Sequence, residues 1–213
     1  MRTSVGELIV ATRNAGKVRE FRALLAPLGR PLLDLESVGI TATAAEDAVE
    51  SEPTFEANAL AKARYFAIRS AGRPVLADDS GLCVAALGGK PGVRSRRYAG
   101  VTGSEAVVSA ANCAKLLAEL VGVTDRRAEF VCAIAYVEGP REIIVRGRAG
   151  GRILDRARGT GGFGYDPLFW SDDLKRTFAD APEQDKARVS HRARAVAQLT
   201  AVLSGGASGP RAD

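Results

Sequence analysis

The sequence predicts an α/β fold built around a single buried core. Its first 35 residues already alternate strand, polar turn, amphipathic helix and strand, which is how α/β folds begin. Further strand-like and helical segments follow in mixed order. With 213 residues, of which 46% are hydrophobic, the chain can bury one core with two lobes rather than form two separate domains.

The opening unit runs from residue 8 to residue 35. Residues 8–11 form a short apolar strand, and the polar turn of residues 12–16 follows it. A helix begins near Lys17, because apolar residues then recur at the i, i+3, i+4, i+7 spacing of one buried face. These residues are Phe21, Leu24, Leu25 and Leu28. The next strand is expected at residues 32–35.

A loop and a second helix are expected next. Residues 41–53 read as an acidic loop that carries Glu46, Asp47, Glu50 and Glu52. Thr54 is a suitable N-cap for a helix that ends near Ser70. Asn58 and Lys62 are four residues apart, so they share one face of this helix.

The rest of the chain alternates strands and helices. The expected elements are a strand at residues 75–77, a second strand that breaks into a glycine-rich turn within residues 82–92, a helix at 104–121, a hairpin of strands at 130–137 and 142–148, and a helical region from about Pro182. The domain is therefore expected to cover residues 1–203. The tail of residues 204–213 is rich in Gly, Ser, Ala and Pro, and we expect it to be disordered.

Composition narrows the classes of partner. The net charge of +5 favours anionic partners without choosing between nucleic acid and nucleotides. The basic residues are scattered and match no nucleic-acid-binding motif, so no stable nucleic-acid partner is expected. No apolar run reaches the ~18 residues that cross a bilayer, and the N-terminal residues lack signal-peptide features, so we expect a cytoplasmic protein without a membrane partner. Three widely spaced cysteines form no CxxC pair and are expected to be small buried residues.

The run Asp78-Asp79-Ser80-Gly81 follows the apolar strand of residues 75–77. Adjacent side chains on a regular strand point to opposite faces, so one carboxylate can face a cleft while the other supports the loop. Carboxylates at a strand end are suitable oxygen ligands for magnesium, and one of them can also orient water. Taken alone, the run also fits an Asx-turn in which aspartate caps backbone amides.

Two further segments suit a nucleotide. The turn Thr12-Arg13-Asn14-Ala15-Gly16-Lys17 leads into a helix, whose free amides and positive dipole end attract phosphate, although P-loop spacing is absent. The segment Phe163-Gly164-Tyr165-Asp166 combines glycine, aromatic rings that can stack on a base, and an acceptor. An ordinary polar helix cap and an aromatic hairpin turn are the alternatives.

The last segment contains Lys186, Ser190, His191 and Arg192. On one unbroken helix, Lys186 and His191 would lie about 140° apart, at ~100° per residue. Ser190 is a good N-cap residue, so we expect the helix to break there and restart. His191 and Arg192 would then lie in a first turn and point into a site. The alternative is a solvated basic helix face.

Together these segments resemble a known enzyme family. The segments ATRNAGK, TFEANALAKA, ADDSGLCVAALGGKPGVRSRRYAG, GTGGFGYDPLF and KARVSHRARA are similar, in order, to those of the noncanonical purine NTP pyrophosphatases, the inosine triphosphate pyrophosphatase or HAM1-like family. The resemblance covers about residues 8–203. It implies a long twisted mixed sheet with flanking helices, two lobes around a central nucleotide-binding cleft, and a homodimer. It also implies Mg²⁺-dependent hydrolysis of ITP, dITP and XTP to monophosphate and pyrophosphate.

The resemblance also implies roles for single residues. Asp79 would be the proton acceptor and a magnesium ligand, with Glu50 as the second ligand. Ser80 and Lys62 would contact the substrate. The phosphate-binding turn would be Thr12, Arg13, Asn14, Ala15, Gly16 and Lys17. Contacts to the nucleotide and base would come from Phe163, Gly164, Tyr165, Asp166, Lys186, His191 and Arg192.

The sequence departs from the family pattern near the second helix. Where the family often has Thr-Phe-x-Glu-Asn, this chain has Thr54-Phe55-Glu56-Ala57-Asn58, which removes the glutamate of a capping box. Either Glu50 or Glu52 can be the metal-site residue, and spacing favours Glu50.

The expected mechanism is attack of water on the α-phosphorus, with Asp79 as base and basic groups neutralising the phosphates. Donors from Arg192 and His191 would favour a purine with a 6-carbonyl over adenine. Two rival functions are a Maf-like pyrophosphatase for other modified nucleotides and a non-enzymatic nucleic-acid-binding module, which would show strongly salt-dependent binding.

Overall fold

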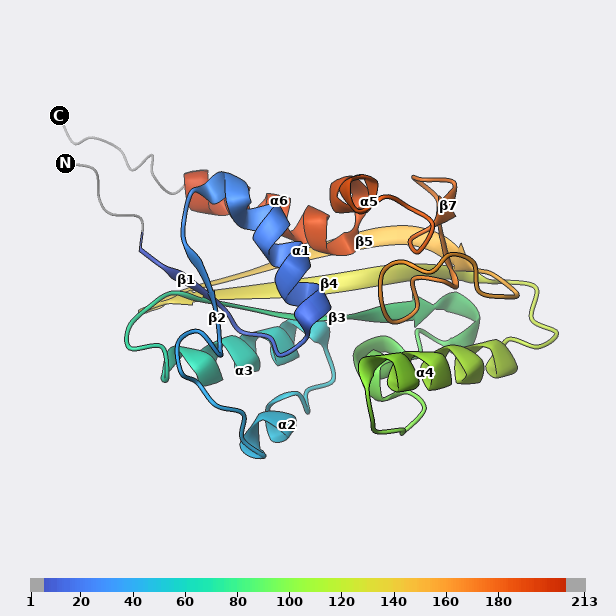
Figure 1. Cartoon of the computed structure of the whole chain (residues 1–213), viewed down its shortest axis with the longest axis horizontal. Helices are drawn as coiled ribbons and strands as arrows, with labels where there is room; N and C mark the ends of the chain where they lie inside the picture. The colour runs from blue at the N-terminus through green and yellow to red at the C-terminus, as the bar shows by residue number, and fades with distance from the viewer. Residues whose placement is uncertain (1–5, 206–213) are drawn as a thin grey trace.

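The computed structural model describes residues 6–205, which form a long mixed sheet with helices on both faces (Figure 1). The seven strands run in the order β2-β1-β3-β4-β5-β6-β7. β1 is parallel to its neighbours β2 and β3, whereas the other neighbouring pairs are antiparallel. The bounds are β1 Leu8–Val10, β2 Leu32–Asp34, β3 Val75–Val84, β4 Arg127–Glu138, β5 Arg141–Ile153, β6 Phe169–Ser171 and β7 Arg176–Thr177.

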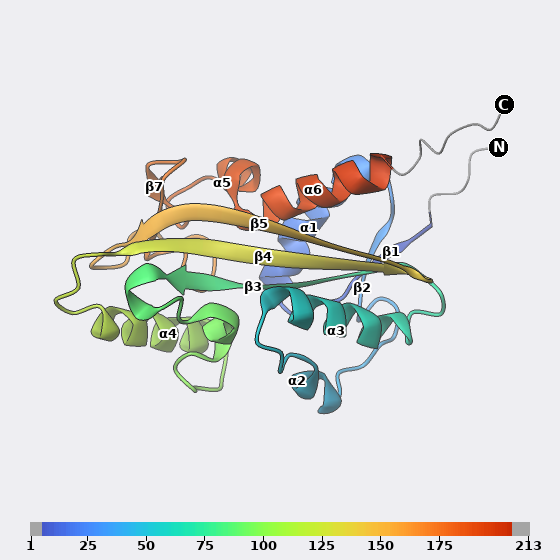
Figure 2. The ribbon, with the colours of Figure 1, turned by 180° about the vertical axis from the view of Figure 1, so that it is seen from behind.

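Two groups of helices enclose the sheet. Figures 1 and 2 show α1, α5 and α6 on one face, with α3 and α4 on the other and α2 beyond α3. The α-helices are α1 Ala15–Leu25, α2 Ala45–Val49, α3 Phe55–Ala67, α4 Glu105–Glu119, α5 Glu183–Val189 and α6 His191–Gly205. Three short 3-10 helices are η1 Ala26–Leu28, η2 Ala85–Leu87 and η3 Gly92–Arg97. Among residues 6–205, no helix is both long and apolar enough to span a membrane.

The alternation of side chains along β1 explains how both faces of the sheet are filled. Leu8 and Val10 pack on the side of α1 and α6, in a cluster with Phe21. Ile9 points the other way and packs with Phe55 of α3. Farther along the sheet, a third cluster joins β3 and β4 to α4 and β6 and includes Leu82, Leu116, Phe130 and Phe169. The predicted α/β fold is therefore confirmed.

β3 is the strand that organises the site. The sequence predicted a strand at residues 75–77 and, within residues 82–92, a second strand that breaks into a glycine-rich turn. The separation into two strands is wrong, because β3 is one strand of 10 residues, whereas the break is confirmed by η2 and the turn that follow β3. β3 stays regular because it pairs with β4 along its whole length, from Val75 opposite Val137 to Val84 opposite Ala128. On its other edge β3 pairs with β1 only at Val75 and Leu76. The remaining edge of β3 is therefore left to other elements.

The predicted cap at Thr54 is confirmed by its hydrogen bond, and a second cap, at Ser104, was not predicted. Thr54 Oγ1 accepts from Ala57 N at the start of α3, and Ser104 Oγ accepts from Val107 N at the start of α4. Ser190 has extended backbone angles after α5, and its Oγ accepts from the third residue along. The predicted helix break at Ser190 is therefore confirmed.

Three other predictions need correction. The acidic loop of residues 41–53 contains the short helix α2, which the sequence prediction missed. α6 continues through Gly205, two residues into the tail predicted to be disordered, and residues 206–213 lie outside the described residues. All three cysteines are free, but only Cys132 is fully buried.

Candidate active site

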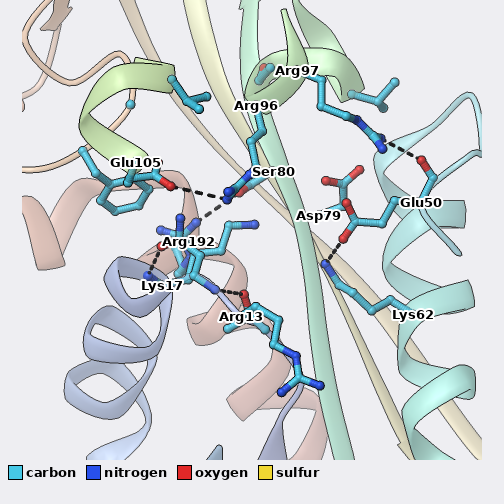
Figure 3. A pocket seen from close by; sticks show the side chains of 18 of the residues that line it. Arg13, Lys17, Glu50, Lys62, Asp79, Ser80, Arg96, Arg97, Glu105 and Arg192 are labelled. Carbon is cyan, nitrogen blue, oxygen red and sulfur yellow. Dashed lines mark hydrogen bonds and ion pairs between the residues drawn. The ribbon is translucent and has the colours of Figure 1, made fainter. Parts of the chain in front are cut away.

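A cavity of about 390 Å³ opens beside β3, just past the point where β1 ends. Its walls come from the turn before α1, the end of α2, α3, η3, the first half of α4, the segment around residue 165, and the junction of α5 and α6. Figure 3 shows acidic and basic side chains from these elements pointing into the same space. The cavity therefore brings together segments that are far apart in the sequence.

Asp79 is the carboxylate of β3 on the α3 face. Its side chain is buried, with 7% of the residue exposed, and its Oδ2 accepts a hydrogen bond from Asn58 Nδ2 at 3.0 Å. Burial raises the pKa of Asp79 to about 6, against the opposing charges of Lys17 and Lys62. A carboxylate with this pKa is ionised at neutral pH yet basic enough to accept a proton.

Glu50 and Lys62 form an ion pair at the same end of the cavity. The distance from Lys62 Nζ to Glu50 Oε1 is 2.5 Å. Burial alone would raise the pKa of Glu50, but Lys62 outweighs it and holds that pKa below its usual value. Glu50 lines the cavity, whereas Glu52 is exposed and lies outside its lining. The geometry thus favours Glu50 over Glu52 as the second acidic group.

Asp78 points to the opposite face of the sheet. It is 1% exposed, and its Oδ2 lies 2.9 Å from Lys17 Nζ and 3.5 Å from an Arg192 terminal nitrogen. Burial opposes ionisation, but the charges of Lys17 and Arg192 hold the pKa of Asp78 well below its usual range. Ser80, on the same face, accepts a hydrogen bond from Arg192 at 3.1 Å. Asp78 thus anchors two basic residues and does not line the cavity.

The predicted phosphate-binding turn caps α1. Asn14 Oδ1 accepts from Lys17 N at 2.9 Å, and Thr12 Oγ1 accepts from Asn14 N at 3.2 Å. Arg13 forms an ion pair with Glu46 at 2.8 Å, and both residues line the cavity. Gly16 lies behind the cavity wall, where an added Cβ would come within 2.9 Å of the Phe163 ring.

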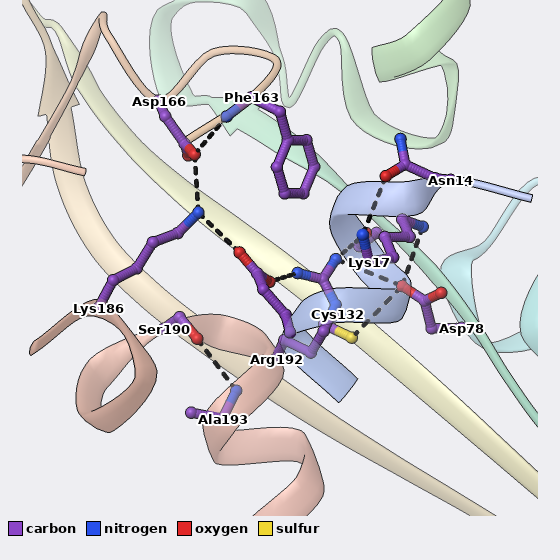
Figure 4. A network of polar contacts seen from close by, with 12 residues as sticks. Asn14, Lys17, Asp78, Cys132, Phe163, Asp166, Lys186, Ser190, Arg192 and Ala193 are labelled. Atoms are coloured by element: carbon purple, nitrogen blue, oxygen red, sulfur yellow. Dashed lines mark hydrogen bonds and ion pairs between the residues drawn. The ribbon is translucent and has the colours of Figure 1, made fainter. Parts of the chain in front are cut away.

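The other end of the cavity holds the aromatic and basic residues. Figure 4 shows Lys186 pointing toward Asp166, with the Phe163 ring nearby. Lys186 Nζ lies 2.7 Å from Asp166 Oδ2 and 2.8 Å from Glu20 Oε1, and Glu20 also pairs with Arg192. Asp166 Oδ2 accepts from Phe163 N at 2.9 Å. This network fixes the cations around the Phe163 ring.

His191 and Tyr165 also lie at the aromatic and basic end of the cavity. His191 is buried, and its ring stacks on Phe130 with centroids 4.9 Å apart. Burial, reinforced by Arg192 and Lys186, holds the pKa of His191 well below its usual value, so the ring is neutral at physiological pH. The Tyr165 hydroxyl donates to Ser95 O at 2.8 Å, which ties the segment to η3.

Most residues predicted for the site meet in this cavity. The predicted residues that line it are Thr12, Arg13, Asn14, Lys17, Glu50, Lys62, Asp79, Ser80, Phe163, Gly164, Tyr165, Asp166, Lys186, His191 and Arg192. Ala15 and Gly16, the first two residues of α1, are outside the lining.

Three residues in contact with this set were not predicted as site residues. Glu20 accepts hydrogen bonds from both Lys186 and Arg192. Glu20 follows Lys17 by three residues on a helix, and this spacing could have indicated that it lies near the site. Asn58 contacts Asp79, and its shared face with Lys62 was noted without a role. Arg97 donates to the Glu50 backbone carbonyl at 2.9 Å, a contact across 47 residues that no local pattern signals.

The donor set suits a divalent cation that also binds phosphate. Within residues 6–205, no cluster of three or more His, Cys, Asp and Glu side chains could hold a metal ion alone. Magnesium is commonly held by one or two carboxylates together with substrate phosphates rather than by a complete protein cage. Asp79 and Glu50, both lining the cavity beside Lys17 and Lys62, fit that pattern.

Comparisons with known proteins agree with this architecture. The profile of the Ham1 family matches residues 8–202. A dITP/XTP pyrophosphatase of Ralstonia nicotianae is 48% identical over 195 residues, which cover 90% of this chain and 94% of that protein. A Ham1 protein structure from Coxiella burnetii superposes with a TM-score of 0.80 at 37% identity, covering 93% of this chain and 98% of the other. A structure of a nucleoside-triphosphatase, dITP/XTP pyrophosphatase, from Mycobacterium abscessus gives a TM-score of 0.69 at 40% identity, covering 91% and 98%.

Proposed function

The chain belongs to the Ham1 family, and from that premise we propose that it hydrolyses noncanonical purine nucleoside triphosphates to monophosphate and pyrophosphate. The substrates are dITP, ITP and XTP. One observation carries this proposal beyond family membership. A single cavity has a carboxylate and lysine end, at Asp79, Glu50 and Lys62, and an aromatic and basic end around Phe163. The first end suits a triphosphate, and the second suits a purine.

The phosphate end would act through charge and position. Lys17 and Lys62 would bind the phosphate oxygens, together with the free amides at the start of α1. Asp79 would orient water and accept its proton as it attacks the α-phosphorus, which its pKa of about 6 supports. The leaving group is pyrophosphate. Positioning and electrostatic stabilisation are the main sources of catalysis in such phosphoryl chemistry.

Asp79 and Glu50 are the residues that would hold magnesium. When bound, the cation supplies charge neutralisation to the phosphates. Lys62 holds the Glu50 carboxylate in place, and Asn58 holds that of Asp79. These contacts keep both acidic groups at the cavity before the substrate arrives.

The base end would select the purine. Phe163 would stack on the ring, while Arg192 and neutral His191 would offer donors to a 6-carbonyl. Glu20, Asp78 and Ser80 fix the Arg192 guanidinium, so its direction is set in advance. The 6-amine of adenine would face another donor, which costs about 1–3 kcal/mol in a buried site.

One assay tests the proposed function. Release of pyrophosphate is measured with dITP, XTP, dGTP, dATP and modified pyrimidine triphosphates, with and without Mg²⁺. We expect rapid release only with dITP and XTP in the presence of Mg²⁺. A preference for modified pyrimidines would instead support the Maf-like alternative. Absence of release, combined with strongly salt-dependent DNA binding, would support the nucleic-acid-binding alternative.

The proposal also covers the domain, the oligomeric state and the location of the protein. We propose that residues 1–203 act as one two-lobed pyrophosphatase domain, that the protein works as a homodimer, and that it acts in the cytoplasm, where the triphosphate pool is used for nucleic-acid synthesis. Sedimentation of the purified protein would test the dimer.

A further inference from the structure

The short segment of residues 50–52 carries one acidic group of the site and is held from two sides. Arg97, on η3, donates to the backbone carbonyl of Glu50 at 2.9 Å (Figure 3). Asn58, on α3, bonds both backbone groups of Glu52. α2 ends at Val49 and Glu50 is its C-cap residue, and the last carbonyls of a helix lack partners within the helix. Arg97 of η3 therefore supplies a partner to the C-terminal end of α2.

Asn58 is fully committed to the segment and to Asp79. Its Oδ1 accepts from Glu52 N at 2.8 Å, and its Nδ2 donates to Glu52 O at 3.1 Å and to Asp79 Oδ2 at 3.0 Å. Because the Glu52 N–H needs an acceptor, the amide orientation is fixed, and both Nδ2 hydrogens are used. A single amide thus joins Asp79 to the segment that carries Glu50.

Neither contact is needed to form α3 itself. Thr54 caps that helix, and its apolar face buries Phe55, Ala59, Ala63 and Phe66. Asparagine is a poor residue inside a helix, and a buried amide is costly unless its hydrogen bonds are made. Asn58 is only 1% exposed and makes all three of its bonds to site segments. Its place is therefore better explained by the site than by the helix.

We propose that Asn58 and Arg97 are positioning residues that preset the separation of the Asp79 and Glu50 carboxylates before substrate binds. The inference rests on the proposed function, because the two carboxylates act as a pair only when they share a cation and a triphosphate. Asn58 fixes Asp79 relative to residue 52, and Arg97 fixes residue 50 relative to η3. Partners that orient metal-binding carboxylates typically change metal affinity by 10-fold to 100-fold when they are removed.

The first variant is Arg97→Met, because Arg97 is exposed and its loss leaves the core intact. Arg94→Met is the matched control, since Arg94 is an exposed arginine on the same η3 helix and lies outside the cavity lining. Free Mn²⁺ is followed by electron paramagnetic resonance during titration of the protein with Mn²⁺ in the presence of pyrophosphate. Arg97→Met should weaken Mn²⁺ binding about 10-fold relative to wild type and to Arg94→Met. Arg97→Lys keeps a donor and should lie nearer to wild type than Arg97→Met does.

The second variant is Asn58→Leu, which keeps the approximate size of the side chain and loses both donors without adding a charge beside Asp79. It should also weaken Mn²⁺ binding about 10-fold, and kcat for dITP should fall more than KM rises. Thermal melting checks that it folds, and if it does not, Arg97→Met decides alone. Mn²⁺ binding equal to that of Arg94→Met, or a lowered melting temperature with unchanged Mn²⁺ binding, would overturn the proposal. A wild-type protein that binds Mn²⁺ but releases no pyrophosphate from dITP would instead refute the proposed function.

Discussion

Replacing Asp79 with asparagine should abolish turnover and make the folded protein more stable at neutral pH. Asp79 is 7% exposed, and burial raises its pKa from an ordinary 3.8 to about 6. A raised pKa means that the folded state favours the protonated form. The folded state therefore loses stability as the pH rises through 6 and Asp79 ionises. At about 1.4 kcal/mol per pKa unit, the difference corresponds to about 3 kcal/mol at pH 7 and above.

Asparagine keeps the size of the side chain and an oxygen that can accept from Asn58. The free energy of unfolding, measured with urea in the presence of a chelator, should therefore be up to about 3 kcal/mol higher for Asp79→Asn at pH 7.5. The gap should shrink as the pH falls from about 6 to about 4 and disappear below about pH 3, where the wild-type carboxyl is protonated in both states. Asp172→Asn, at an exposed position, is the control. A gain that is absent at pH 7.5, or that is as large at about pH 3 as at pH 7.5, would refute the argument from burial.

Four other expectations follow from the site. The kcat/KM for dITP should fall as the pH drops through about 6, because Asp79 gains a proton. The same fall should remain in His191→Gln, since burial keeps His191 neutral, and its loss in that variant would assign the fall to the histidine. Arg192→Lys should lower the ratio of kcat/KM for dITP to that for dATP about 10-fold, because one hydrogen bond of about 1–3 kcal/mol is lost. An unchanged ratio would argue against a role of Arg192 in the choice of base. Gly81→Ala should lower the free energy of unfolding by about 1–3 kcal/mol in denaturant melts, because the new Cβ would lie 2.4 Å from Gly92 O. A variant as stable as the wild type would mean that η3 can move away from the new side chain. Removal of divalent cations with a chelator should stop pyrophosphate release, and added Mg²⁺ should restore it; full activity in the chelator would exclude the cation-dependent scheme.

Local patterns were enough to predict most of the helices, the strands β1 and β2, the hairpin of β4 and β5 and several segments of the site, but not α2, β6 or β7. The cap at Thr54 and the break at Ser190 follow from short-range hydrogen bonding, which the sequence displays directly. The resemblance to a family then brought together segments that no local pattern could join. Both sources agree with the cavity that the fold forms.

What escaped prediction depends on long-range pairing. β3 looked like two strands because Asp78 and Asp79 are unusual in a buried strand, and only its ladder with β4 keeps it continuous. Glu20 looked like an ordinary helix residue until α5 and α6 placed Lys186 and Arg192 beside it. Arg97 was one arginine in a basic cluster, and its contact with Glu50 exists only after η3 packs against β3.

The opposite directions of Asp78 and Asp79 give the two faces of β3 different tasks. Asp78, on the face of α1 and α6, pairs with Lys17 and Arg192, and both of these basic residues line the cavity together with Asp79, which lies on the face of α3. The two aspartates are linked by one peptide bond, so a shift of the strand by a single position would exchange their faces. The 10-residue ladder with β4 holds this register over the whole strand. Substitutions that loosen the ladder far from the cavity should therefore impair base selection and turnover together.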